Sequence, residues 1–266
     1  MSCSYSAQGD VAVLQIDNPP VNALSMLTRV QLREGLEKGI SSSEIAAIIV
    51  TGTERTFIGG ADIKEFGTAD SLAEPSLAAL IDLIENSPKP VIAFIQGTAL
   101  GGGLEIALGC QMRVASADAR LGLPEVALGI MPGAGGTQRT PRLTGVAFAL
   151  DMMTSGRHVT AQAARDAGLV DAIVDNGLDS ALAFVRQHVV GQTLAPRPNK
   201  AAGTDPAVFA EARARLKKSA RGAEAPFAIV DCVERACTAS LAEGLAYEQE
   251  RFFNLYEVVP VFWTGC

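Results

Sequence analysis

A run of three glycines and a single glutamate stand out in the stretch GTALGGGLEIALGC, residues 97–110. Gly101–Gly103 follow a strand-like segment and open a helix-like one, and Glu105 stands among apolar residues about one turn beyond Gly102. A strand that ends in glycines and opens a helix exposes backbone N–H groups at the positive end of the helix dipole. Because glycine has no Cβ, another group can come close to that backbone. Such a turn could stabilise an oxygen that becomes negatively charged during a reaction.

A second glycine turn and a second glutamate could complete such a site. The turn Gly59-Gly60-Ala61-Asp62 also follows a β-type segment, so it could supply another backbone N–H, and two converging donors would form an oxyanion hole. Glu125 lies in a further apolar setting, GLPEVALG. Two carboxylates in surroundings of low polarity resist ionisation, so one of them should have a raised pKa. That condition suits an acid and base pair that works near neutral pH.

Each of these features also has an ordinary structural explanation. A GGG run more often forms a tight turn or a close helix contact than an oxyanion hole. A lone glutamate in an apolar helix usually lies on the exposed face, and Glu125, after Pro124, could simply cap or line a loop. Spacing alone leaves these alternatives open.

Other kinds of catalytic site have less support. Only two histidines occur, and neither His158 nor His188 lies in a glycine-rich segment, so a histidine-activated nucleophile is weakly supported. The five cysteines are odd in number and show no CxxC spacing. We therefore expect no metal site and no disulfide framework, and a reducing, cytoplasmic location.

Composition limits the classes of partner. Of the 266 residues, 48% are hydrophobic and 19% charged, which favours a sizeable buried core over disorder. The net charge of −7 argues against nucleic acid as the main partner, because phosphate binding needs a basic surface. The basic run at 213–221 is typical of a solvated helix face, with contact to a ligand phosphate as the lesser alternative. We find no signal peptide and no apolar run long enough to span a bilayer.

The expected elements alternate between strands and helices, which is the α/β pattern. Glycine- and proline-rich residues 132–145 are expected to form a loop, and 194–206 a linker. Strands are expected at 11–17, 47–50 and 90–97, and helices at 28–39, 76–88, 101–110, 146–156, 160–170, 178–191, 207–221 and 228–253.

At these residues the sequence resembles the enoyl-CoA hydratase/isomerase family, the crotonases. The resemblance runs from about residue 10 to about residue 190, with a weaker match to about residue 254. It is carried by the stretches NPPVNALS, FIGGADIKEF, PKPVIAFIQGTALGGGLEIALGCQMRVAS, ARLGLPEVALGIMPGAGGTQRTPRL and TAQAARDAGLVDAIV. Together, in this order and spacing, these stretches favour the functional interpretation of the glycine turns and of the two glutamates.

The resemblance implies an α/β fold, a crotonase-like spiral of repeated ββα units with a helical C-terminal region. It divides the chain into a core at 1–195 and a linker with C-terminal helices at 196–266. It also implies a homo-oligomer, a trimer or a dimer of trimers. The substrate would be an acyl-CoA thioester, and no cofactor is expected, because coenzyme A enters as part of the substrate.

Site residues follow from the resemblance position by position. Ala61 and Gly102 match the two residues whose backbone N–H groups hold the thioester oxygen. Glu105 matches the base that acts on the water adding to Cβ, and Glu125 the acid that protonates Cα. Gly133 matches a glycine whose backbone helps place that water and glutamate.

The turn after Ala61 is expected to line the coenzyme A site through Asp62, Ile63 and Lys64. The implied activity is reversible hydration of a trans-2-enoyl-CoA to 3-hydroxyacyl-CoA, in fatty-acid β-oxidation. Isomerisation of 3-enoyl-CoA to 2-enoyl-CoA and a non-catalytic acyl-CoA-binding scaffold are the alternatives. Residues 170–226 resemble the hydratase/isomerase portion of multifunctional fatty-acid oxidation enzymes, whereas YEVVPVFWTGC at 256–266 matches nothing expected of the family.

Overall fold

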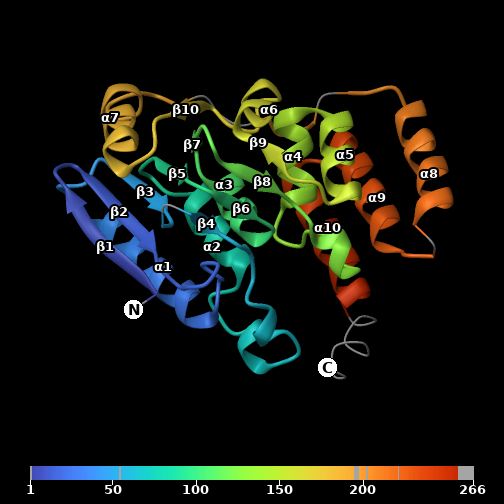
Figure 1. The fold of residues 1–266 in the computed structure, drawn as a ribbon, viewed down its shortest axis with the longest axis horizontal. Coiled ribbons are helices and arrows are strands. Elements are labelled where there is room, and N and C mark those ends of the chain that lie inside the picture. The colour runs from blue at the N-terminus through green and yellow to red at the C-terminus, as the bar shows by residue number, and fades with distance from the viewer. Residues whose placement is uncertain (1, 54, 195–197, 202, 221, 257–266) are drawn as a thin grey trace. The chain divides into compact units, whose positions relative to one another are not determined.

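The computed structural model describes residues 2–256 apart from 54, 195–197, 202 and 221, and the chain forms two compact units (Figure 1). The N-terminal unit contains Met1–Leu121, Thr160–Asp166 and Val170–Ala195. The C-terminal unit contains Gly122–Val159, Ala167–Leu169 and Pro196–Cys266. The structure assigns 122–159 and 167–169 to the C-terminal unit, and the division into a core at 1–195 and a C-terminal region at 196–266 stays a prediction.

A six-stranded sheet is the centre of the N-terminal unit. Its first two strands form an antiparallel pair in which Cys3 lies opposite Ile16, and every later neighbour is parallel. The strands occur in the order β1 (Cys3–Gln8), β2 (Val11–Ile16), β3 (Ala47–Thr51), β5 (Val91–Ile95), β7 (Met112–Ser116) and β10 (Ala172–Val174).

The short strands that alternate with these along the chain form a second sheet. Its order is β4 (Thr56–Ile58), β6 (Thr98–Leu100), β8 (Arg120–Gly122) and β9 (Val159–Thr160). The helices between them are α1 (Met26–Ser41), α2 (Leu77–Glu85) and α3 (Gly102–Gly109). The order β1-β2-α1, β3-β4-α2, β5-β6-α3 repeats strand, strand, helix. The expected α/β class is confirmed, and this order fits a spiral of ββα units.

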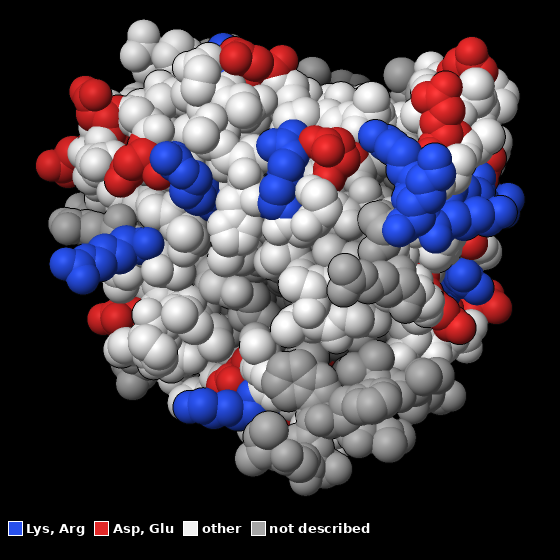
Figure 2. Space-filling view, turned by 45° about the vertical axis from the view of Figure 1, so that its right-hand side comes forward, with Lys and Arg blue, Asp and Glu red and all other residues white. Residues whose placement is uncertain are grey.

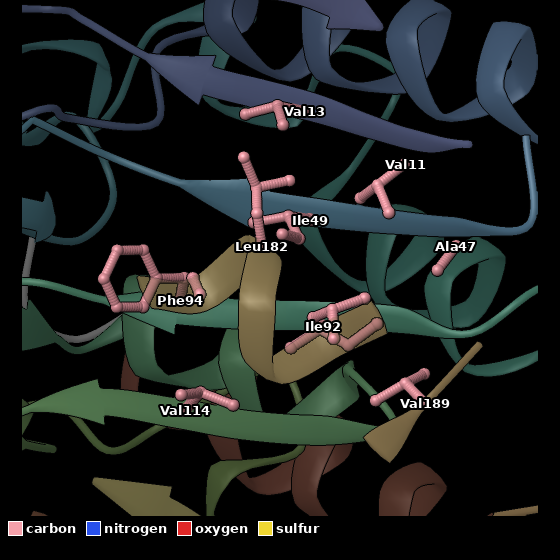
Figure 3. Close-up of a cluster of buried hydrophobic side chains, with 11 residues drawn as sticks. Val11, Val13, Ala47, Ile49, Ile92, Phe94, Val114, Leu182 and Val189 are labelled. Carbon is pink, nitrogen blue, oxygen red and sulfur yellow. The ribbon is translucent and has the colours of Figure 1, made fainter. Parts of the chain in front are cut away.

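The strands β2, β3 and β5 of the six-stranded sheet are buried on both faces, which explains their near-continuous apolar runs. Side chains that alternate along β2, β3, β5 and β7 form a cluster under α7 (Leu178–His188) (Figure 3). The cluster consists of Val11, Val13, Ala47, Ile49, Ile92, Phe94, Val114, Ala181, Leu182, Val185 and Val189. The opposite face packs on α1, where a Cβ at Gly35 would collide with Leu14 and one at Gly39 would lie 2.9 Å from Ile48 Cδ1.

Most of the expected elements of the N-terminal unit are confirmed. Strands 11–17, 47–50 and 90–97 correspond to β2, β3 and β5, and the helices at 28–39 and 76–88 correspond to α1 and α2. The expected N-cap of α6 (Ala161–Asp166) is present, because the Thr160 hydroxyl accepts from Ala163 N at 3.1 Å. Sequence reasoning missed β1, β6, β7, β9 and β10.

Helices make up the C-terminal unit. α9 (Ala225–Thr238) packs against α4 (Gly136–Thr144), α5 (Val146–Ser155), α8 (Ala207–Ser219) and α10 (Leu241–Tyr256). The part of the unmatched C-terminal stretch at 257–266 lies outside the described residues. Within the described ranges, no helix combines the length and the apolar character that crossing a bilayer requires.

The expectation of a loop at 132–145 was wrong over most of its length, because Gly136–Thr144 form α4. An interior proline costs a helix about 3 kcal/mol, and Pro141 lies inside this one. Tertiary contacts offset that cost. The buried carboxylate of Glu248, on α10, accepts hydrogen bonds from Gly135 N at 2.5 Å, Thr137 N at 2.8 Å and the Thr137 hydroxyl. A distant side chain thus caps the helix, where local sequence indicates only a turn.

The expectation of one long helix at 228–253 was also wrong, because the chain breaks between α9 and α10. Ser240 and Glu243 form a capping box at the break. Ser240 N donates to Glu243 Oε2 at 2.9 Å, and Glu243 N donates to the Ser240 hydroxyl at 3.3 Å. The hydrogen bond from Ser240 N, with one from its hydroxyl, lowers the pKa of Glu243. This signal was present in the sequence as the spacing Ser-x-x-Glu.

Glu248→Gln should destabilise the protein, because the amide nitrogen cannot accept the hydrogen bonds that the second carboxylate oxygen accepts. We expect the free energy of unfolding, measured by urea denaturation followed by circular dichroism, to fall by about 2 kcal/mol. Glu250→Gln is the matched control, since Glu250 is exposed on the same helix, and its effect should stay within about 0.5 kcal/mol. Equal denaturation midpoints for both variants would contradict the capping role of Glu248.

Candidate active site

The two glycine turns follow neighbouring parallel strands. The turn at 59–61 comes directly after β4, and Gly101–Gly103 come directly after β6. β4 and β6 pair in parallel, with Thr56 beside Thr98 and Ile58 beside Ala99. Because the carboxyl ends of parallel strands meet at one edge of a sheet, both turns emerge at the same edge.

Each glycine of the GGG run has its own physical reason. Gly101 adopts φ 52° and ψ −128°, a conformation that residues with a side chain rarely adopt. A Cβ at Gly103 would collide with the backbone carbonyl of Ile58, so the start of α3 lies directly on the end of β4. Gly101 and Gly103 are therefore required by the fold itself. The reason for a glycine at position 102 is a different one.

Gly102 lies beside Ala61. A Cβ built on Gly102 would lie 3.6 Å from Ala61 N, and one built on Gly60 would lie 4.0 Å from Gly102 N. The turn that contains Ala61 is held in place from the other side, since Leu24 N donates to Gly60 O at 2.8 Å and Gly59 N to Val21 O at 2.9 Å. The structure therefore brings together the two residues that were expected to donate to one oxygen.

Glu105 lies in the first turn of α3, a helix in which every residue is buried. Only 3% of Glu105 is exposed, so the alternative that this glutamate lies on an exposed helix face was wrong. Its backbone N–H donates to Gly101 O at 3.0 Å, which is the first hydrogen bond of the helix. Glu105 thus lies one turn from Gly102, near the positive end of the helix dipole.

Glu125 and Gly133 belong to the C-terminal unit, whereas Glu105 belongs to the N-terminal unit. Glu125 is partly exposed and begins the 3₁₀ helix η3 (Glu125–Leu128) after Pro124. Gly133 packs against α10, because a Cβ there would lie 2.5 Å from the ring of Phe252. The catalytic roles expected for both residues stay predictions.

The three residues expected to contact coenzyme A follow Ala61 on the short 3₁₀ helix η1 (Ile63–Glu65) and its cap. Asp62 caps this helix by accepting from Lys64 N at 3.0 Å. The side chain of Lys64 is exposed, and Ile63 is 46% exposed. Their position beside Ala61 is compatible with the expected contact, which stays a prediction.

Sequence reasoning missed Arg29 and Glu65. Arg29 is only 5% exposed, although it is charged, and it pairs with Glu65 at 3.1 Å. Glu65 belongs to the GADIKE turn, four residues after Ala61. The available signal was helical spacing: Arg29 falls on the same face of α1 as Leu32 and Leu36, both fully buried.

Two buried cysteines and one histidine lie outside the two glycine turns. Burial raises the pKa of Cys3 and of Cys232 to about 12, so neither thiol is ionised at neutral pH. His188 contacts the ring of Phe184 at 4.7 Å between centroids. In the described part of the chain, no group of three or more His, Cys, Asp or Glu residues is placed to hold a metal ion.

In the basic run at 213–221, Arg213 is engaged in ion pairs within the C-terminal unit. It donates to Asp231 at 2.7 Å and to Glu234 at 2.5 Å, and these hydrogen bonds raise its pKa. The charge of Arg213 is therefore largely balanced by neighbouring acids.

Comparison with known proteins gives one consistent family. Over 252 residues the chain is 44% identical to a peroxisomal bifunctional enzyme of Danio rerio, covering 92% of this chain and 34% of that protein. It is 48% identical over 165 residues to a probable enoyl-CoA hydratase of Bacillus subtilis, covering 60% of this chain and 64% of that protein. The chain thus spans about a third of the length of the bifunctional relative.

Comparison with solved structures indicates the same family as the sequence comparisons. An enoyl-CoA hydratase subunit I from Geobacillus kaustophilus superposes with a TM-score of 0.65 at 30% identity, covering 97% of this chain and 90% of the other. The model of the family described as enoyl-CoA hydratase/isomerase matches residues 6–202. The chain therefore belongs to the enoyl-CoA hydratase/isomerase family.

Proposed function

We propose that this chain catalyses the reversible addition of water to a trans-2-enoyl-CoA thioester, giving 3-hydroxyacyl-CoA. The observation that carries this proposal is the position of Gly102 beside Ala61, with the buried Glu105 one helical turn away. Family membership and the names of the relatives, a probable enoyl-CoA hydratase among them, support the same reaction.

The thioester oxygen accepts from the backbone N–H groups of Ala61 and Gly102. When water adds to Cβ, electron density moves onto that oxygen, and the two donors stabilise the enolate-like transition state. Loss of one such donor costs roughly 3 kcal/mol of transition-state stabilisation. Backbone donors suit this task because the fold holds them in place before the reaction begins.

Two carboxyl groups move the protons. Glu105 takes a proton from the water whose oxygen bonds to Cβ, and Glu125 delivers a proton to Cα. The backbone at Gly133 helps to place that water and Glu125. Water is thereby added across the double bond, and Glu105 and Glu125 return to their starting protonation states by proton exchange with solvent before the next turnover.

Substrate binding needs no separate cofactor, because coenzyme A arrives as part of the substrate and Asp62, Ile63 and Lys64 line its site. Nucleic acid is a poor partner for a chain of net charge −7. On the face drawn in Figure 2, basic side chains gather at the upper right, and acidic side chains lie beside them.

Isomerisation of a 3-enoyl-CoA to a 2-enoyl-CoA is the second candidate activity. The family description names both hydratases and isomerases. A single carboxylate can move the proton between Cα and Cγ, and Glu125 is the residue proposed for it. The oxyanion donors would serve both reactions, because each passes through negative charge on the thioester oxygen.

The proposed pathway is fatty-acid β-oxidation, which is named for relatives such as the glyoxysomal multifunctional protein of Cucumis sativus. Cytoplasmic location stays a prediction, and the peroxisomal and glyoxysomal names of relatives favour a different compartment. Assembly into a trimer or a dimer of trimers also stays a prediction, which light scattering after gel filtration would test.

Glu105→Gln should lower kcat for hydration of crotonyl-CoA by about 10²–10⁴-fold, because the amide cannot accept a proton from water. The measurement is the loss of absorbance of the conjugated enoyl thioester. The same variant should affect isomerisation of a 3-enoyl-CoA far less, since Glu125 moves that proton. Undiminished hydration, or equal losses in both assays, would contradict the assigned roles.

Gly102→Ala and Gly103→Ala should fail for different reasons. The methyl group of Gly102→Ala would meet the flexible end of Leu77 at 2.7 Å and would lie beside Ala61 N. We expect this variant to fold but to lose about 10²-fold or more in kcat. Gly103→Ala should instead lose about 3 kcal/mol of unfolding free energy, through its collision with the Ile58 carbonyl.

Thermal unfolding and steady-state kinetics of the two variants separate these effects. Full activity in a folded Gly102→Ala protein would exclude the space between Gly102 and Ala61 as the position of the thioester oxygen.

A further inference from the structure

The segment between Ala61 and α2, residues 62–76, is here called the 62–76 loop. Its first residue follows Ala61, and its last, Ser76, caps α2 by accepting from Ala79 N at 3.2 Å. The next residue, Leu77, is the side chain that a Cβ on Gly102 would meet. Both ends of the loop therefore lie next to the two proposed backbone donors.

Arg29 binds the C-terminal part of this loop, residues 70–75. Its Nε donates to Pro75 O at 2.9 Å, and its Nη2 donates to Asp70 O at 2.6 Å and to Ala73 O at 3.3 Å. These acceptors are backbone carbonyls, so the contacts depend on the conformation of the loop and not on its side chains. The guanidinium group therefore stabilises one backbone conformation of the loop.

The same guanidinium group holds both flanks of Ala61. Its Nη1 donates to Glu65 Oε2 at 3.1 Å and to Leu24 O at 3.0 Å. Glu65 Oε1 also accepts from Met26 N, at the start of α1, at 2.8 Å. Leu24 N in turn donates to Gly60 O, the carbonyl directly before Ala61.

All five N–H groups of the Arg29 side chain can thus be matched with an acceptor: one at Nε, two at Nη1 and two at Nη2. A lysine has three donors on one nitrogen and could not reproduce this planar arrangement. A surface arginine would need no such complete set of partners. The arrangement is specific for one guanidinium and for one conformation of residues 60–75.

We propose that Arg29 is a positioning residue of the oxyanion hole. Through Glu65 on one side of Ala61, and through Leu24 and Gly60 on the other, it holds the Ala61 N–H where it can share one oxygen with the Gly102 N–H. The inference rests on the proposed function, because it assigns a task to these two donors. A displacement of about 1 Å in a reacting group can cost on the order of 10² in rate, so a side chain that touches no substrate can control kcat.

The test compares Arg29→Lys with the wild-type chain by two independent readouts. The first is infrared spectroscopy of bound hexanoyl-CoA with carbon-13 in the thioester carbonyl. This saturated substrate analogue cannot be hydrated, and hydrogen bonds to its carbonyl oxygen lower the stretching frequency. We expect a lowered frequency in the wild-type complex and a return toward the free value in Arg29→Lys. The second readout is crotonyl-CoA hydration, in which kcat should fall about 10²-fold with KM changed by less than about threefold.

Glu65→Gln provides a second variant in case Arg29→Lys folds poorly. It removes the charge from the ion pair and leaves the carbonyl acceptors of Arg29 in place. We therefore expect the carbonyl frequency to return less far toward the free value, and kcat to fall less, than in Arg29→Lys. Arg33→Gln is the matched control, since Arg33 lies one turn further along α1 in an exposed pair with Glu37 at 3.7 Å. Its carbonyl frequency and kcat should equal those of the wild type.

The inference is overturned if Arg29→Lys and Glu65→Gln retain the wild-type carbonyl frequency, even where kcat falls together with thermal stability. That result would reduce Arg29 to a purely structural role. A wild-type complex with an unshifted carbonyl also overturns it. If the wild type lowers the frequency and Arg29→Lys restores it, while no enoyl-CoA is hydrated, the proposed function fails and the positioning role stands.

Discussion

Close backbone contact between the end of β4 and the start of α3 is the constraint on which the proposed site depends. Gly103 has no Cβ, so the Ile58 carbonyl can lie directly against the first turn of α3. That contact sets Gly102 beside Ala61 and points α3 so that Glu105 follows one turn later, buried. The position of the donors is therefore a property of backbone packing. Side chains can vary around it as long as the glycines remain.

The architecture places this contact where chemistry is possible. The buried strands β2, β3, β5 and β7 form the middle of the six-stranded sheet, and the short strands β4 and β6 pair separately in parallel. Because the two short strands run in the same direction, both glycine turns leave at one edge. The repeated strand–strand–helix order produces two equivalent turns from two successive repeats, and one supplies each proposed donor. A repeated local pattern thus yields a site that neither repeat contains alone.

The sequence was sufficient for the features that follow local rules. Buried strands such as 47–50, and helices with a hydroxyl cap such as the one after Thr160, could be predicted from apolar runs and capping chemistry. α4 could not, because its cap is the carboxylate of Glu248, more than a hundred residues away. The break between α9 and α10 was available in the spacing of Ser240 and Glu243 and was overlooked.

The candidate site shows the same division. Glycine turns and an isolated glutamate are visible in one dimension, whereas the proximity of Ala61 to Gly102 is a result of strand pairing. Arg29 escaped notice because a charged residue in an amphipathic helix is ordinarily assigned to solvent. Its burial has a cause only once the carbonyls of residues 70, 73 and 75 converge on it.

The two glycines of α1 that face the sheet, Gly35 and Gly39, extend this dependence beyond the site. Without side chains there, α1 lies directly against Leu14 and Ile48, and Arg29 is carried on the same helix. A methyl group added at Gly35 would lie 2.4 Å from Leu14 Cδ2, so either the Leu14 side chain or α1 would have to shift, and a shift of α1 would move the guanidinium group with it. Two glycines that contact no substrate would then affect the rate of the reaction through the position of Arg29. Selection for turnover, and not only for stability, would then preserve the glycines at positions 35 and 39.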